Sequence, residues 1–253
     1  MPDESDSSSA PSMSSGMSSD ISRNDPSDGP QPPCDLRDAI FPPPLPLRED
    51  ADESGSVWGF RDSRFLVNTD GNVEFSGARY AIAGQELSEL LPWMARTLSV
   101  DLDPADRFEA APTRSARPSR ATPELCDALV AALSEERVVL AEERRRRCGH
   151  GHTQDEVFAL RTGGLDHIPD VVVEPVSGSE IAAVLRVASA TRSCVVPYGG
   201  GTNVTLALRP PAAEERTIIA LDLRRMNRIR WIDRRNRLAC IEAGAVGRQL
   251  AAS

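Results

Sequence analysis

Lysine is absent from this sequence of 253 residues, in which all 29 basic residues are arginine. The P-loop of nucleotide-binding proteins needs a lysine that reaches the phosphates, so that kind of phosphate site is excluded. No stretch approaches the ~18 consecutive apolar residues of a membrane-spanning helix. The opening residues, MPDESDSSSA, have neither the basic nor the apolar stretch of a secretory signal, and we expect none.

Excess positive charge is also missing, because 29 basic residues face 38 acidic ones and the net charge is −9. This balance argues against nucleic acid as a partner. The five cysteines are scattered without a CxxC pair, which indicates free thiols in a reducing compartment. They are Cys34, Cys126, Cys148, Cys194 and Cys240.

One group of metal-ligand residue types does occur, in RCGHGH, where Cys148, His150 and His152 lie close together. A zinc site needs further partners at a recognisable spacing, and His167 is the only other histidine. We therefore favour a structural role for these residues and assign no metal site.

Composition divides the chain into three parts. Residues 1–55 are rich in Ser, Asp and Pro and are predicted to be a disordered leader, with FPPPLP as a stiff spacer or, alternatively, a ligand for a polyproline-binding domain. Residues 56–160 are predicted to form a hairpin and helical region with a linker near 101–121. Residues 161–253 show the alternation of strands and helices that is typical of a domain with a parallel sheet.

The middle part begins with RFLVN, TDGN and VEFSG, which predict a hairpin because Asp-Gly favours a tight turn. A helix is expected over 85–100, and four aromatic residues are expected to anchor the core. These are Trp58, Phe60, Phe65 and Trp93. A second helix is expected from the cap at Thr122 to the run EERRRRCG, with its arginines solvated at the helix end; an anion or targeting patch is the alternative for this run.

The last part reads as strand, helix and strand over IPDVVVEP, SGSEIAAVLRVASAT and CVVPYGGG. This order predicts a right-handed crossover between parallel strands. RTIIALDLRRM predicts a further strand, and two strands are expected around the turn DRRN. A final helix begins within about ten residues of Ser253, so we expect the domain to continue beyond this sequence.

Three consecutive glycines follow the strand that ends in CVVPY. A loop at the carboxyl end of a parallel strand is the usual ligand position in such sheets, and successive glycine N–H groups can surround an anion. A tight structural turn, the alternative, would need only one glycine. We predict that this loop binds the diphosphate of a dinucleotide through Pro197, Tyr198, Gly199, Gly200, Gly201, Thr202 and Asn203.

The loop does not follow the Rossmann pattern G-x-G-x-x-G. Gly199 and Gly201 fit its first half, but Val204 occupies the third glycine position and no helix is expected to open there. A different dinucleotide-binding scheme is therefore required.

PYGGGTN, TIIALDLRRMNRI and ACIEAGAVGRQL together resemble the FAD-binding domain of the vanillyl-alcohol oxidase flavoprotein family. The resemblance implies an α+β fold with a PCMH-type FAD-binding domain, present here as its first half, and FAD as the cofactor. Members with covalent flavin often have a histidine at the end of the glycine run. Gly201 stands there, so the resemblance implies noncovalent FAD.

Two further segments are similar to one family within this group, the alkylglycerone-phosphate synthase (alkyl-dihydroxyacetonephosphate synthase) family. They are VWGFRDSRFLVNTDGNVEFSGARYAIAG and GHGHTQDEVFALRTGGLDHIPDVVVEP. That family exchanges the acyl chain of acyl-dihydroxyacetone phosphate for a long-chain fatty alcohol in ether-lipid biosynthesis. The resemblance implies these substrates, a peroxisomal location without a visible import signal, and allows a homodimer and a peripheral membrane contact.

The family's substrate domain lies beyond the glycine loop, so no catalytic residue is assigned and this chain is expected to be inactive alone. Two other functions stay open. One is an FAD-linked D-2-hydroxy-acid dehydrogenase or oxidase, and the other is a non-catalytic interaction module that uses the proline-rich arm.

Overall fold

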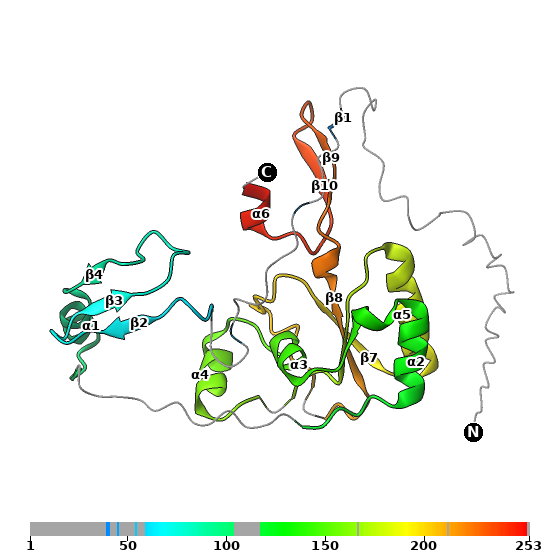
Figure 1. Ribbon diagram of the computed structural model, residues 1–253, viewed down its shortest axis with the longest axis horizontal. Coiled ribbons are helices and arrows are strands. Elements are labelled where there is room, and N and C mark those ends of the chain that lie inside the picture. The colour runs from blue at the N-terminus through cyan, green and yellow to red at the C-terminus, as the bar shows by residue number, and fades with distance from the viewer. Residues whose placement is uncertain are drawn as a thin grey trace, which may run out of the picture.

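The computed structural model describes residues 39–40, 45, 54, 59–103, 117–165, 167–211 and 213–251. A four-stranded sheet forms the centre of the molecule (Figure 1). Its strands, in spatial order, are β5 (Val138–Val139), β6 (Val171–Val173), β8 (Ile218–Asp222) and β7 (Cys194–Tyr198). The last three run parallel and β5 is antiparallel to β6.

The two inner strands, β6 and β8, are buried along their whole length, as their continuous apolar runs predict for strands covered on both faces. Helix α5 (Gly178–Ala190) connects β6 to β7. It begins at Ser177, whose hydroxyl accepts a hydrogen bond from the backbone N–H of Glu180. The predicted strand–helix–strand order is confirmed, and β8 lies between the two connected strands.

Two apolar clusters cover the sheet. On one face, α5 packs beside α2 (Pro123–Ala132) over the strands (Figure 1). This cluster comprises Leu125, Leu129, Val171, Val173, Val184, Ala188, Ile219 and Leu221. The second cluster includes Cys148 and Tyr198, and it lies towards α3 (Glu142–Cys148). Both clusters together hold β6, β7 and β8 in one core.

The arginine run is placed differently from its prediction. The expected single helix from Thr122 is wrong: α2 ends at Ala132, and the turn η2 (Glu135–Arg137) and strand β5 follow before α3 begins. Arg145, Arg146 and Arg147 are buried rather than solvated. They can be buried because carbonyl and carboxylate oxygens meet the run; Nε of Arg145, for example, donates to the carbonyl of Pro169 at 2.8 Å.

The sheet core also extends further towards the N-terminus than the predicted boundary at residue 161. The apolar stripe of α2 packs on α5, and β5 supplies an edge strand. The predicted domain boundary was placed where the strand pattern begins, whereas the core also includes the apolar side chains of α2.

A second sheet consists of β1 (Ala39–Ile40), β9 (Ile229–Asp233) and β10 (Leu238–Ile241), all antiparallel. The hairpin of β9 and β10 confirms the two strands expected around DRRN, and it stands away from the central sheet in Figure 1. Strand β1 falls within the leader that was predicted to be disordered, so that prediction fails for these two residues. The 3₁₀ turn η3 (Leu223–Arg225) leads towards the hairpin, and α6 (Gly247–Ala251) follows it.

The N-terminal unit contains β2 (Phe65–Val67), β3 (Val73–Phe75), β4 (Glu86–Leu87) and α1 (Leu90–Leu98). The predicted hairpin is confirmed by the antiparallel pairing of β2 with β3. Helix α4 (Gln154–Thr162) belongs to the following part of the chain. No helix within the described ranges is long and apolar enough to cross a bilayer.

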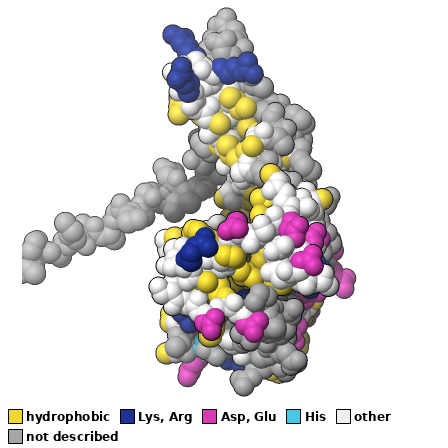
Figure 2. Space-filling model, turned by 90° about the vertical axis from the view of Figure 1, so that its left-hand side faces the viewer, with side chains coloured by type: hydrophobic (Ala, Val, Ile, Leu, Met, Phe, Trp, Pro, Cys, Tyr) yellow, Lys and Arg dark blue, Asp and Glu magenta, His cyan; other side chains and the backbone are white. Residues whose placement is uncertain are grey.

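Large apolar side chains of the N-terminal unit are exposed. Phe65 is 58% and Trp93 55% exposed, so their predicted role as core anchors is wrong; Phe60 is half-buried, and Trp58 lies outside the described residues. Short strands and one helix offer too little surface to cover them. In Figure 2, viewed from the side of this unit, hydrophobic side chains are visible on its surface among polar and charged ones.

The close approach of Gly244 to η3 gives a prediction for stability. A Cβ at Gly244 would lie 1.7 Å from the carbonyl oxygen of Leu223, so Gly244→Ala must shift backbone. We expect a loss of about 1–3 kcal/mol in the free energy of unfolding, measured by urea denaturation. Gly247→Ala, whose Cβ would meet no heavy atom within 4 Å, is the control and should cost nothing. Equal stability of the two variants would contradict this packing.

Candidate functional site

The carboxyl ends of three parallel strands meet at one edge of the sheet. Strand β7 ends at Tyr198 and β8 at Asp222, and the register pairs these two residues directly. Glu174 follows the end of β6. The glycine loop leaves β7 at this edge, which is the usual position of a ligand in sheets of this kind.

The first half of the loop is open and has unused donors. Among the described residues, no hydrogen bond uses the backbone N–H of Gly199, Gly200, Gly201 or Thr202. A Cβ at Gly200 would meet no heavy atom within 4 Å, and one at Gly199 would come no closer than 3.5 Å to the carbonyl of Ala243. The loop therefore offers both space and N–H donors to an anion.

Gly201 has a different role from Gly200. Its φ of +69° lies in the left-handed region, and a Cβ there would lie 2.3 Å from the hydroxyl oxygen of Tyr198. Tyr198 is fully buried. The third glycine thus lets the loop pass closely over the tyrosine ring. Pro197 is tolerated because β7 is an edge strand, where a missing N–H costs least.

The loop exit turns inward at Asn203, which is buried and has a φ of +55°. Its Nδ2 donates to Oε1 of Glu156, and its Oδ1 accepts from the backbone N–H of Leu208 at 2.8 Å. Thr202 remains exposed. Of the seven predicted residues, Pro197 and Tyr198 end β7 and the other five form the loop, in which the amide of Asn203 bonds within the protein.

The GHGH segment, residues 149–152, packs against the exit of this loop. The N–H of His152 donates to the carbonyl of Thr202 at 3.0 Å, and a Cβ at Gly151 would overlap that of Asn203 at 2.0 Å. Nδ1 of His150 lies 2.8 Å from the Gly151 carbonyl, and burial lowers the pKa of this imidazole. The sequence predicted a structural role for the histidines but did not indicate that their segment packs against the glycine loop.

Cys148 contacts a carboxylate instead of sharing a ligand with the histidines. Its Sγ lies 3.6 Å from Oδ2 of Asp222, and burial raises the pKa of the thiol. Across the described ranges there is no group of three or more His, Cys, Asp or Glu residues that could hold a metal.

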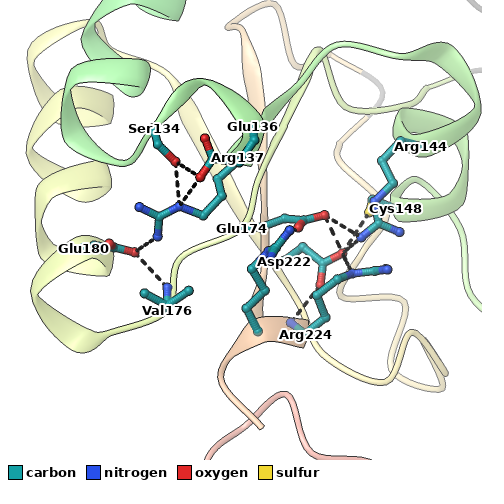
Figure 3. Close-up of polar contacts among 11 residues, drawn as sticks. Ser134, Glu136, Arg137, Arg144, Cys148, Glu174, Val176, Glu180, Asp222 and Arg224 are labelled. Atoms are coloured by element: carbon teal, nitrogen blue, oxygen red, sulfur yellow. Dashed lines mark hydrogen bonds and ion pairs between the residues drawn. The ribbon is translucent and has the colours of Figure 1, made fainter. Parts of the chain in front are cut away.

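A buried ionic network joins the ends of β6 and β8 (Figure 3). Arg144 reaches both Glu174, at 3.1 Å, and Asp222. Arg224 Nε donates to Asp222 at 2.9 Å, and Arg225 Nε donates to Glu174 at 2.8 Å. Burial raises the pKa of Asp222, and the charge of Arg144 opposes that rise. Three guanidinium groups thus share two carboxylates at this end of the sheet.

A further arginine lies near Tyr198, the last residue of β7 before the glycine loop. The guanidinium carbon of Arg147 is 5.7 Å from the centroid of the Tyr198 ring, and the side chain is buried. Arg147 of the run EERRRR thus packs beside Tyr198, although the sequence alone favoured a solvated helix end.

Comparison with known proteins agrees with this geometry. Residues 169–253 match the family described as FAD binding domain. Alkyldihydroxyacetonephosphate synthase of Caenorhabditis elegans is 35% identical over 202 residues, which cover 76% of this chain and 32% of that protein. The synthase of the same name from Dictyostelium discoideum is 33% identical over 113 residues, 44% of this chain and 18% of that one.

A solved structure of an alkyldihydroxyacetonephosphate synthase superimposes with a TM-score of 0.68 at 22% identity, over 79% of this chain and 38% of that one. At this identity the likeness establishes the fold alone. The predicted α+β fold with a PCMH-type FAD-binding domain is confirmed, and so are FAD as its cofactor and the resemblance to these synthases. The chain spans about a third of the length of the C. elegans relative, 32%.

The ionic network gives a second prediction for stability. Asp222→Asn removes the charge that Arg144 and Arg224 share, and it leaves them partly uncompensated in a buried position. We expect a loss of about 3–5 kcal/mol in the free energy of unfolding, measured by chemical denaturation. Glu143→Gln, which breaks an exposed pair with Arg61, is the control and should cost at most about 1 kcal/mol. A cost for Asp222→Asn as small as the control's would show that the network is not needed.

Proposed function

Since residues 169–253 belong to the FAD-binding domain family, and a longer part of the chain resembles alkyldihydroxyacetonephosphate synthases, we propose that this chain is the N-terminal part of such a synthase. The observation that most supports the cofactor site is the open glycine loop at the carboxyl edge of β7, with N–H groups that no described residue uses. A diphosphate needs such donors together with close access to the backbone.

The residues of the loop divide into two kinds. The N–H groups of Gly199, Gly200, Gly201 and Thr202 would bind the diphosphate of FAD. Pro197, Tyr198 and Asn203 would shape the loop that presents these donors.

The chain fits noncovalent FAD. A larger residue at Gly201 would overlap the Tyr198 hydroxyl, so this position has no room for the histidine that often attaches flavin in covalent relatives. When bound, FAD supplies the redox-active ring, and the residues described here bind and orient the cofactor.

The reaction follows from the resemblance rather than from residues of this chain. We propose that the full-length protein exchanges the acyl chain of acyl-dihydroxyacetone phosphate for a long-chain fatty alcohol, in ether-lipid biosynthesis and in the peroxisome. No catalytic residue is assigned here, and this part of the protein is expected to be inactive by itself. A homodimer is part of the same proposal, with sedimentation of the full-length protein as its test.

A peripheral membrane contact is also proposed, because both substrates have long alkyl chains. The exposed apolar side chains of the N-terminal unit support it, notably Phe65, Trp93 and Leu98, which is 59% exposed. Flotation of the full-length protein with phosphatidylcholine vesicles tests the contact, and a protein that stays at the bottom of the gradient would count against it.

Gly200 gives the sharpest test of the cofactor site. Gly200→Val places a branched side chain where the diphosphate would lie, but it meets no protein atom within 4 Å of its Cβ. We expect the full-length variant to fold with an unchanged melting temperature in its apo form and to lose at least about tenfold in FAD affinity. Flavin fluorescence titration measures the affinity, and unchanged binding would remove the loop from the site.

The reaction class is tested on the full-length protein with two substrates. We expect incorporation of a labelled fatty alcohol into alkyl-dihydroxyacetone phosphate without net reduction of the flavin. Reduction of the flavin by a D-2-hydroxy acid, without alkyl exchange, would instead identify the dehydrogenase alternative. Purified protein without flavin or either activity would favour the interaction module.

A further inference from the structure

A glutamate outside the glycine run holds the exit of the loop. Helix α4 begins with a capping box, in which Oε2 of Glu156 accepts from the N–H of Thr153 at 3.2 Å and from its hydroxyl at 2.8 Å. The other carboxylate oxygen, Oε1, accepts from Nδ2 of Asn203. One carboxylate therefore connects the first turn of α4 with the loop.

This contact fixes a residue in an unusual backbone conformation. Asn203 has a φ of +55°, in the region that favours glycine and, among other residues, asparagine. Both ends of its amide are bonded, to Glu156 and to the N–H of Leu208. Gly151 lies so close that a Cβ there would come within 2.0 Å of the Cβ of Asn203, so the segment before α4 packs directly against this residue.

The charge of Glu156 is kept by its partners. Burial acts to raise the pKa of this carboxyl, but hydrogen bonds from Thr153, Gly151 and Asn203 outweigh burial and lower it below the usual value. An ionised carboxylate would repel a diphosphate, so Glu156 is unsuited to direct contact with the cofactor. Its arrangement instead suits the holding of the asparagine amide.

We propose that Glu156 is a positioning residue for the cofactor loop. By holding Asn203 in the left-handed conformation, it presets the N–H groups of Gly199 to Thr202 for the diphosphate before FAD arrives. A loop already in its bound conformation loses less entropy on binding, so the affinity is higher. This inference rests on the proposed FAD site.

The chain offers a matched control in α5. Glu180 occupies the same third position of a capped helix: its N–H donates to the Ser177 hydroxyl, and its Oε2 accepts from the N–H of Val176 at 2.8 Å. It also pairs with Arg137 at 2.6 Å (Figure 3). None of these partners belongs to the glycine loop, so truncation of Glu180 removes a comparable cap without touching the loop.

The experiment compares full-length wild type, Glu156→Ala, Glu156→Gln and Glu180→Ala. For each protein, the Kd for FAD is measured by flavin fluorescence, and the apo melting temperature by circular dichroism. We expect Glu156→Ala to weaken FAD binding by at least about tenfold. Glu180→Ala should lower the melting temperature to a similar extent but keep the Kd within about threefold. Glu156→Gln should restore much of the affinity, because its amide oxygen can still accept from Asn203.

Equal affinities of Glu156→Ala and Glu180→Ala would overturn the inference. If Glu156→Ala does not fold, Asn203→Asp serves as the second variant, because it is isosteric but lacks the donor and sets two carboxylates against each other. It should weaken FAD as Glu156→Ala does, and unchanged affinity would again overturn the proposal. Wild type that binds no FAD would contradict the proposed function itself, which keeps the two failures distinguishable.

Discussion

Parallel pairing of β7 with β8 places Tyr198 beside Asp222, and the whole site depends on that register. The pairing brings the start of the glycine loop to the same edge as the buried carboxylates of Glu174 and Asp222. These carboxylates can be buried only because arginines from α3 and η3 meet them. The loop, the ionic network and the two apolar clusters therefore form one unit rather than separate features.

The proposed site would favour an anion through backbone N–H groups that no described residue uses. This depends on the absence of a side chain at Gly200, which leaves the space beside these donors open. The arginines of α3 and η3 have a different role, because they pair with Glu174 and Asp222 and so allow these carboxylates to be buried at the same end of the sheet.

Much of the sheet could be predicted from the sequence because its signals are local. The apolar run of β6, the cap at Ser177 and the glycines after β7 each lie within one short stretch. The arginines of α3 could not be placed in the same way, since their partners are distant in the sequence. Arg144 pairs with Glu174 and Asp222, 30 and 78 positions further along the chain, and Arg145 donates to the carbonyl of Pro169, 24 positions further along. Glu156 was likewise missed, because a capping glutamate looks the same in sequence whether or not an asparagine meets its second oxygen.

The prediction that aromatic residues of the N-terminal unit are buried was wrong for the opposite reason. Phe65 and Trp93 have the side chains of core residues, but their burial needs a partner surface that three short strands and α1 do not supply. Composition thus indicated what these side chains favour, and only the arrangement of elements could indicate whether that preference is met. Phe75, on the middle strand β3, is buried and packs against Tyr80, whereas Phe65, opposite it on the edge strand β2, stays exposed.

Strand β1 has a consequence for how the protein is expressed. Ala39 and Ile40 pair with the outer edge of β9, although they lie within the part of the chain that was predicted to be a leader. An expression boundary at residue 56, which composition alone would recommend, deletes this short strand and leaves a row of backbone donors and acceptors uncovered. A bare edge of this kind can pair with a strand of a neighbouring molecule, so we expect a recombinant version that begins at residue 56 to self-associate.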